Sequence, residues 1–154
     1  IDHCLVGSEM CIRDRHQCGL DNLEQVKIEY ESRNIEAEVL EFFNKPEEQI
    51  KWSDFVVSRA GALSLSEITS MKKGALMIPL PNSIDNHQYE NAKKIEDMGM
   101  GILHEEDEDI SYLTDKLNEI IKDKKYINWK KNELTIHVNA ANEIVKHIEE
   151  YLNK

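Results

Sequence analysis

Short apolar runs alternate along this chain with segments whose apolar residues recur every three or four positions. Four runs have the length and composition of buried strands, at residues 39–43, 55–58, 75–79 and 101–104. The segments between them predict helices at residues 22–33, 47–52, 63–73 and 86–98. Because continuous apolar strands alternate with helices, we expect an α/β fold in which helices flank both faces of a parallel sheet.

After residue 104 the pattern becomes purely helical. Residues 110–122 predict one helix, and the last helix carries a regular apolar stripe formed by Leu134, Val138, Ala141, Val145, Ile148 and Leu152. We expect this stripe to pack across the domain's own surface, with a coiled-coil partner as the alternative. Two of the earlier helices are followed by glycines that predict helix ends, Gly74 and Gly99.

Composition narrows the class of protein. The chain has 154 residues, enough for one domain, and 30 Asp and Glu against 19 Lys and Arg give a net charge of −11. This acidity argues against binding to nucleic-acid phosphates and against a basic membrane-binding patch. Three cysteines, an odd number, argue against a disulfide framework. We therefore expect a cytoplasmic domain with no nucleic-acid partner and no direct membrane contact.

The first fifteen residues do not share this pattern. The run Met10–Arg15 resembles the translated end of a transposon used in sequencing libraries. We therefore expect residues 1–15 to be an assembly scar and the domain to occupy residues 16–154, with an ordinary irregular N-terminus as the alternative. We expect no metal site from the cysteines and the histidine at this end of the chain, Cys4, Cys11, His16 and Cys18.

An acidic run, Glu105–Asp109, precedes the helix predicted at residues 110–122. The ligand spacing and the turn glycine of a calcium-binding loop are absent, which argues against calcium. We expect a solvated loop whose charges favour the N-terminus of the following helix.

Two segments that follow predicted strands carry candidate chemistry, because ligands of open α/β sheets bind at the carboxyl ends of the strands. Ser58–Glu67 leaves a strand, turns on small residues and begins a helix, whose free N–H groups suit a diphosphate. The alternative is a capping box of Ser64 and Glu67, which is the better interpretation of this segment taken alone. Asp85–Ala92 follows the next strand and can bind sugar hydroxyls; helix capping is its alternative. A third, polar motif, His16–Gly19, predicts nothing by itself.

Together, in this order and spacing, these segments resemble the MurG family, bacterial transferases that add N-acetylglucosamine to lipid I in peptidoglycan synthesis. The matching stretches are His16-Gln17-Cys18-Gly19, Glu41-Phe42-Phe43-Asn44, Arg59 to Glu67, Ile78-Pro79-Leu80-Pro81 and Asp85 to Ala92. The resemblance covers roughly residues 16–150 and implies the donor-binding, C-terminal half of a two-domain GT-B glycosyltransferase. It implies a Rossmann-like parallel sheet flanked by helices, truncated at its N-terminal side, with a helical C-terminus.

The resemblance also implies a site for UDP-N-acetylglucosamine. Phe43 would contact the uracil through its backbone, residues 62–64 would face the diphosphate, and the Glu67 carboxylate would accept hydrogen bonds from the ribose. Gln88, with His87 beside it, would contact the hydroxyls of N-acetylglucosamine. The full set of implied substrate-binding residues is Phe43, Ala62, Leu63, Ser64, Leu65, Ser66, Glu67, His87 and Gln88.

The family's Gly-rich loop, the first strand and helix of its donor domain and its acceptor domain have no counterpart in this sequence. The general base belongs to that part, so we expect no catalytic residue here, and no metal or other cofactor. The implied parent enzyme is an inverting transferase, peripheral on the cytoplasmic face of the membrane, and this chain alone would be inactive. The alternatives are a free-standing donor-binding subunit that needs a membrane partner, a related UDP-sugar:lipid transferase, or an α/β domain without a ligand.

Overall fold

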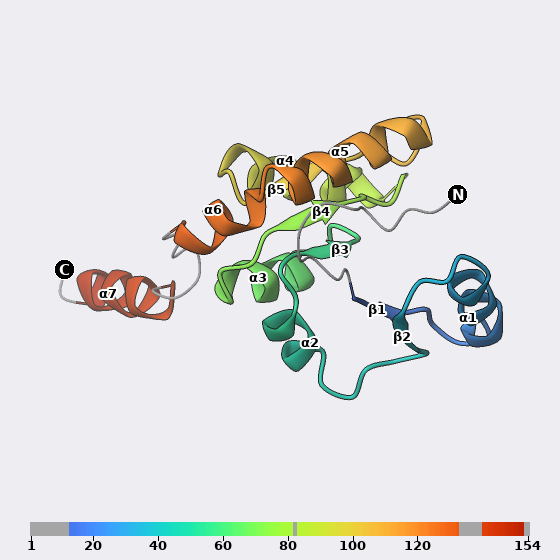
Figure 1. The fold of residues 1–154 in the computed structure, drawn as a ribbon. Helices are drawn as coiled ribbons and strands as arrows, with labels where there is room; N and C mark the ends of the chain where they lie inside the picture. Colours follow the sequence, from blue (N-terminus) through green and yellow to red (C-terminus); the bar gives the residue numbers. More distant parts are fainter. Residues whose placement is uncertain (1–12, 82, 133–139, 153–154) are drawn as a thin grey trace. The chain divides into compact units, whose positions relative to one another are not determined.

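The chain divides into two compact units, Ile1–Gln49 and Ile50–Lys154 (Figure 1). The computed structural model describes residues 13–81, 83–132 and 140–152. Strands are parallel wherever they pair, and the described strands form two sheets, β1-β2 in the first unit and β3-β4-β5 in the second. The expected α/β fold of parallel strands flanked by helices is therefore confirmed, with two short sheets rather than a single one.

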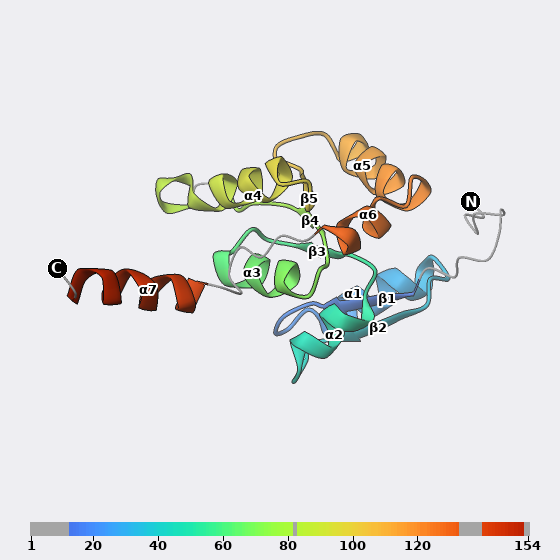
Figure 2. The same cartoon turned by 90° about the vertical axis from the view of Figure 1, so that its left-hand side faces the viewer.

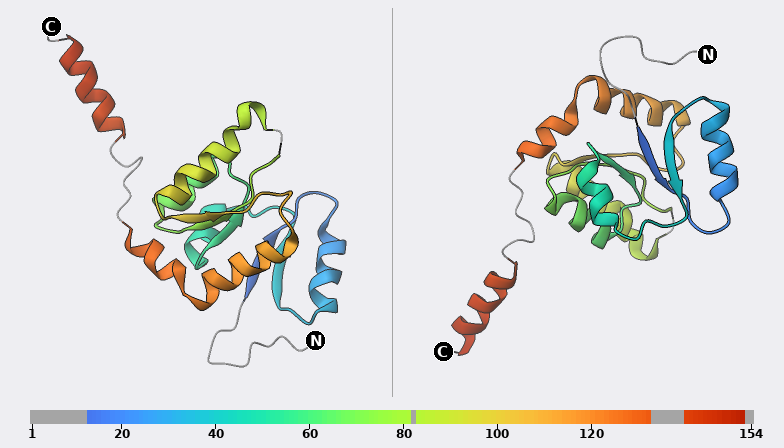
Figure 3. Two further views of the ribbon diagram at one scale, coloured as in Figure 1. Left: turned by 90° about the horizontal axis from the view of Figure 1, so that it is seen from above. Right: turned by 60° about the horizontal axis from the view of Figure 1, so that its bottom comes forward.

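The first unit contains a two-stranded sheet, β1 (Asp14–Gln17) and β2 (Ala37–Leu40), with helix α1 (Leu23–Ser32) between them in sequence. Helix α1 lies alongside this sheet (Figure 3). The sequence pattern did not predict β1, because all four of its side chains are polar. Arg15 forms an ion pair at 3.0 Å with Glu38, the residue opposite it on β2. The boundary expected after residue 15 thus falls inside a strand.

Strand β2 ends earlier than the apolar run predicts. The run reaches Phe43, whereas the regular pairing stops at Leu40, opposite Gln17. Two backbone hydrogen bonds follow, from Cys18 to the carbonyl of Leu40 and from Gly19 to that of Glu41. Gly19 then turns the chain away with φ of 76°. Phe43 consequently lies in the loop between β2 and helix α2 (Pro46–Trp52).

The second unit is built on strands β3 (Val56–Ser58), β4 (Ala75–Met77) and β5 (Gly101–Leu103), with the central β4 fully buried. Alternate side chains of β4 face opposite sides of the sheet, which creates two core clusters. Ala75 and Met77 pack with residues of α3 (Ala62–Ser70) and α4 (His87–Asp97). Leu76 packs on the other side, with residues of α5 (Ile110–Lys122) and α6 (Lys125–Lys131). Figure 2 shows these two helix layers on either side of the strands.

Two predicted helix ends have different outcomes. Gly99 has φ of 68° and ends α4, as expected. The prediction for Gly74 is wrong, because α3 ends at Ser70 and Lys72 takes the left-handed conformation with φ of 56°. Gly74 instead provides room for an aromatic ring: a Cβ atom there would lie 2.2 Å from carbons of Trp129.

The C-terminal segment contains one helix more than the pattern predicts, since α6 follows α5 after Lys124, whose φ is 50°. The last helix, α7, spans Ala140–Leu152, and the first two residues of its predicted stripe, Leu134 and Val138, lie outside the described residues. The later stripe residues Val145, Ile148 and Leu152 are more than half exposed. The expected packing of these three side chains onto the domain is therefore wrong.

Candidate functional site

Three loops of the second unit leave its sheet at the same edge. The strands are parallel and in register, with Ser58, Met77 and Leu103 side by side at their carboxyl ends. The pairing continues one residue further, because Ile78 N–H donates to the Ser58 carbonyl and His104 N–H donates to the Met77 carbonyl, both at 2.9 Å. The segments that begin at residues 59, 78 and 104 therefore start next to one another, where ligands of parallel sheets bind.

The N-terminus of α3 is open at this edge. Gly61 is its N-cap residue, in an extended conformation, and as a glycine it has no side chain that could cap the helix. The first three helical residues, Ala62, Leu63 and Ser64, are exposed, and the first turn contains no acidic residue. The N–H groups of a first helical turn have no partner within the helix and carry the positive end of its dipole. This helix start is thus suited to an anion.

The structure does not form the capping box that the sequence allows. Ser64 is the third residue of α3, and the N-cap position belongs to Gly61, so Ser64 and Glu67 lie too far along the helix to cap it. The Glu67 side chain is exposed and has no hydrogen-bond or ion-pair partner among the described residues. Leu65 is 3% exposed, so its side chain belongs to the core and only its backbone is available to a ligand. Ser66 is half-buried.

The start of α4 is shaped by two consecutive residues in the left-handed conformation, Asp85 and Asn86, with φ of 52° and 54°. Asn86 is the N-cap residue but makes no side-chain cap, and His87 begins the helix with an exposed side chain. Gln88 is half-buried, and its Oε1 accepts a hydrogen bond of 3.0 Å from the Leu80 backbone. This bond orients the side chain and engages its oxygen, while Nε2 is the donor end of the amide.

Phe43 belongs to the first unit, whereas the other predicted site residues belong to the second. Its N–H donates to Oε1 of Gln17 at 3.1 Å, so the polar motif at the end of β1 holds the loop that carries Phe43. Sequence reasoning did not assign this role to Gln17; the motif His16–Gly19 was the available signal. The remaining predicted residues all lie on α3 and at the start of α4, two helices of the second unit that pack against each other.

An ion pair that the sequence did not predict joins two of the three loops. The guanidinium of Arg59 makes two contacts with the carboxylate of Glu106, Nη1 to Oε2 at 2.6 Å and Nη2 to Oε1 at 3.2 Å. This hydrogen-bonded contact lowers the pKa of Glu106 and raises that of Arg59. Both side chains are about half exposed. Nη1 of Arg59 also donates to the Ile78 carbonyl at 3.3 Å, so this side chain, which directly follows β3, contacts the segments that follow β4 and β5.

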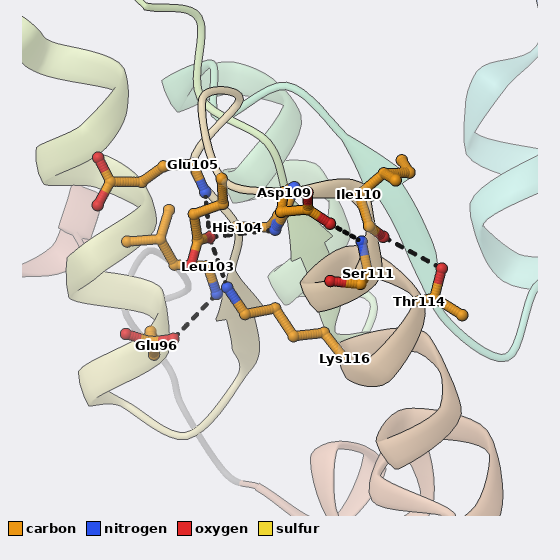
Figure 4. A network of polar contacts seen from close by, with 10 residues as sticks. Glu96, Leu103, His104, Glu105, Asp109, Ile110, Ser111, Thr114 and Lys116 are labelled. Carbon is orange, nitrogen blue, oxygen red and sulfur yellow. Dashed lines mark hydrogen bonds and ion pairs between the residues drawn. The ribbon is translucent and has the colours of Figure 1, made fainter.

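The acidic run has definite partners rather than only solvent (Figure 4). The carboxylate Oε2 of Glu108 lies 2.6 Å from Nζ of Lys116, 2.8 Å from the backbone N of Glu105 and 3.1 Å from Nδ1 of the buried His104. The hydrogen bonds from Lys116 and Glu105 lower the pKa of Glu108. Among the residues that the structure describes, no group of three or more His, Cys, Asp or Glu side chains could hold a metal ion.

Within the described ranges, no helix is long and apolar enough to cross a membrane.

Comparison with known proteins gives a consistent result. The sequence model of the glycosyltransferase family 28 C-terminal domain matches residues 3–149. One relative is a transferase of Wolbachia sp. subsp. Drosophila simulans (strain wRi). Its name is UDP-N-acetylglucosamine--N-acetylmuramyl-(pentapeptide) pyrophosphoryl-undecaprenol N-acetylglucosamine transferase. The two sequences are 37% identical over 140 residues, which cover 89% of this chain and 41% of the relative. The transferase of the same name from Rickettsia bellii (strain RML369-C) is 42% identical over 121 residues, which cover 77% of this chain and 34% of that relative. This chain therefore spans less than half the length of these relatives.

Two solved structures share the fold. The crystal structure of Acinetobacter baumannii MurG superimposes with a TM-score of 0.78 at 24% identity, over 93% of this chain and 42% of that one. The spinosyn forosaminyltransferase SpnP superimposes with a TM-score of 0.57 at 13% identity, over 100% of this chain and 47% of that one. At these identities the likeness concerns the fold alone.

Proposed function

The chain belongs to the family of glycosyltransferase family 28 C-terminal domains, and on this premise we propose that it binds UDP-N-acetylglucosamine as the donor half of a glycosyltransferase. The parent enzyme would transfer N-acetylglucosamine to lipid I with inversion, as the names of the relatives suggest for them. Its other partners would be an acceptor domain and, through that domain, the lipid. It would act in the cytoplasm, at the inner face of the membrane.

The observation that carries this proposal is the open N-terminus of α3, combined with the Glu67 carboxylate on the same helix, which has no partner among the described residues. The free N–H groups of residues 62–64 would bind the diphosphate and stabilise the charge that builds on the leaving UDP. Glu67 would accept hydrogen bonds from the two ribose hydroxyls. Gln88 would donate from Nε2 to a sugar hydroxyl, since its Oε1 is already bonded to Leu80.

Substitution of Glu67 tests the ribose contact. We expect Glu67→Ala to weaken UDP binding, measured by titration calorimetry, by about 1–3 kcal/mol, the usual range for a lost hydrogen bond to a charged group. The melting temperature should stay unchanged, because the side chain has no partner among the described residues. Asp115→Ala, which removes another exposed helical carboxylate with no partner in the described part of the chain, is the matched control. A lower melting temperature with unchanged affinity would give Glu67 a structural role instead.

Comparison of nucleotides tests the uridine part of the proposal. We expect UDP to bind more tightly than ADP, because contacts to the base through the backbone at Phe43 depend on the shape of the base. The Phe43 N–H is already bonded to Gln17, so the uracil contact would use other backbone atoms of this loop. Equal affinity for the two nucleotides would leave the diphosphate site but remove the preference for uridine.

A further inference from the structure

We propose that Arg59, Glu106 and Asn91 are positioning residues that brace the loop before α3 from two sides and so fix the helix start for the diphosphate. This inference rests on the proposed function, since the diphosphate is its ligand. None of the three residues is assigned a ligand contact by the resemblance or by the geometry described above. Each of them contacts the short segment Arg59–Gly61 or belongs to it.

The first side of the brace is the ion pair between Arg59 and Glu106. Its geometry is bidentate, which makes it more specific and stronger than a single contact between exposed charges. The two residues are 47 positions apart and come together because β3 and β5 end at the same edge of the sheet. The additional bond from Arg59 to the Ile78 carbonyl ties the same guanidinium to the end of the central strand.

The second side of the brace comes from α4. Nδ2 of Asn91 donates a hydrogen bond of 3.3 Å to the carbonyl of Ala60. Ala60 itself is fully buried, and the next residue on α4, Ala92, is also fully buried in the same core cluster. Asn91 thus holds the backbone of the loop from the helix that carries His87 and Gln88, so the two halves of the candidate site are joined directly.

Between these contacts lies Gly61, the N-cap residue of α3, whose carbonyl accepts the first bond of the helix from Leu65 at 3.0 Å. Gly61 has no side chain to fix its own position or to cap the helix. The direction of the free N–H groups therefore depends on how residues 59 and 60 are held. A brace on both sides restricts the conformations of the loop Arg59–Gly61 before a ligand arrives. Binding of the diphosphate then costs less conformational entropy, so this preorganisation favours binding.

A different role for Arg59 would be direct contact with the diphosphate, with Glu106 as a competing anion. The two roles predict opposite effects of the same substitution. If Arg59 is a positioning residue, Glu106→Gln weakens UDP binding, because the guanidinium loses its anchor. If Arg59 is a ligand for phosphate, Glu106→Gln strengthens UDP binding, because the competitor and a nearby negative charge are both removed.

We would measure two quantities on the full chain. Amide hydrogen exchange without nucleotide, followed at Leu65, reports on the first turn of α3 because this N–H bonds to Gly61. Calorimetric titration with UDP reports on the site. The variants are Arg59→Met, Glu106→Gln, their double variant, the charge exchange Arg59→Glu with Glu106→Arg, Asn91→Leu and the isosteric Asn91→Asp. Lys93→Met, which breaks ion pairs elsewhere on α4, is the control.

We expect faster exchange at Leu65 and an affinity for UDP lowered about 2- to 10-fold in each single variant, with no change in the control. The Arg59 and Glu106 double variant should be no worse than either single one, and the charge exchange should recover part of the loss, which direct contact between Arg59 and the phosphate would not predict. Unchanged exchange in the single variants, or tighter UDP binding by Glu106→Gln, would overturn the brace. If the exchange results hold and the unmodified chain binds no UDP, the brace stands and the proposed function fails.

Discussion

At the scale of single residues, Gly74 shows that packing can require a glycine where the sequence pattern predicts only a helix end. A Cβ atom at this position would stand 2.2 Å from the indole of the buried Trp129. We expect Gly74→Ala to lower the free energy of unfolding by about 1–3 kcal/mol, the usual cost of overpacking a core. Chemical denaturation measures this. In a Trp129→Leu background the same substitution should cost much less, and an equal cost there would place the strain elsewhere.

Only some features of the site could be predicted from the sequence, because the others depend on contacts between residues far apart in the chain. The start of α3 and the residues on α3 and α4 follow from local patterns, a turn of small residues and polar groups at a helix start. The pairs Gln17–Phe43 and Arg59–Glu106 are 26 and 47 positions apart, so they depend on strand register, which the sequence does not show. The capping box failed because the helix begins at Ala62, two residues earlier than Ser64.

At the scale of elements, the strongest periodic and apolar segments were predicted well. Helix α5 has the predicted bounds of 110–122, and β3, β4 and β5 each lie inside a predicted apolar run. The failures have physical causes. Strand β1 is polar, so no apolar run marks it, and α6 is separated from α5 only by a left-handed residue, Lys124. Tertiary pairing, rather than local preference, ends β2 at Leu40.

The N-terminus of α5 gives a prediction for the dependence of stability on pH. Asp109 caps the helix by accepting from Ser111 N–H at 2.8 Å, and this bond lowers the pKa of Asp109; contacts from Lys116 and Glu105 lower that of Glu108. A carboxyl whose pKa is lowered in the folded state stabilises the fold above its unfolded pKa, about 4.5 for Glu108, and this stabilisation is lost as the pH falls through the folded value. Stability should therefore fall as the pH drops below about 4.5.

The Glu108→Gln variant tests which carboxyl is responsible. Its stability should depend less steeply on pH below 4.5 than that of the unmodified chain, because one carboxyl with a lowered pKa has been removed. Thermal denaturation at a series of pH values measures the slope. Asp115→Asn on α5, an exposed carboxyl with no partner among the described residues, is the control and should leave the slope unchanged. Identical slopes in Glu108→Gln and the unmodified chain would show that its contacts with Lys116 and His104 do not contribute to acid stability.

At the scale of the whole molecule, the N-terminal boundary can be located by truncation. We propose that residues 1–13 are dispensable, in line with the expectation of an assembly scar, whereas Asp14 and Arg15 contribute to β1. Asp14 accepts a hydrogen bond from Tyr30, and Arg15 contacts Glu38 and Gln49. Removal of residues 1–13 should leave the melting temperature unchanged.

Removal of residues 1–15 should cost about 1–2 kcal/mol of unfolding free energy through the lost side-chain contacts. The double substitution Asp14→Ala with Arg15→Ala in the untruncated 154-residue chain separates those side chains from the backbone pairing of β1. A large loss of cooperativity already after removal of residues 1–13 would show that this segment belongs to the fold.

Sugar transfer requires an acceptor hydroxyl and a general base in addition to the donor-binding groups of the proposed site. Transfer needs the anomeric carbon of the donor and the acceptor hydroxyl held at near-attack distance, and a base that takes the hydroxyl proton. The family matched here is that of a C-terminal domain, and the chain spans 41% of the Wolbachia relative. His87, exposed at the start of α4, is the titratable side chain beside the proposed sugar position, and the resemblance gives it a binding role.

We therefore expect that this chain, incubated with UDP-N-acetylglucosamine and a lipid I analogue, transfers no sugar. Turnover should occur when a separately expressed acceptor domain of a relative is added, because the acceptor and the base would then be present across the site. A radiolabelled donor measures the transfer, and Glu67→Ala in the mixture should lower it in proportion to its loss of UDP affinity. Turnover by the chain alone would mean that the base lies within it, and loss of that turnover in His87→Gln would identify the group.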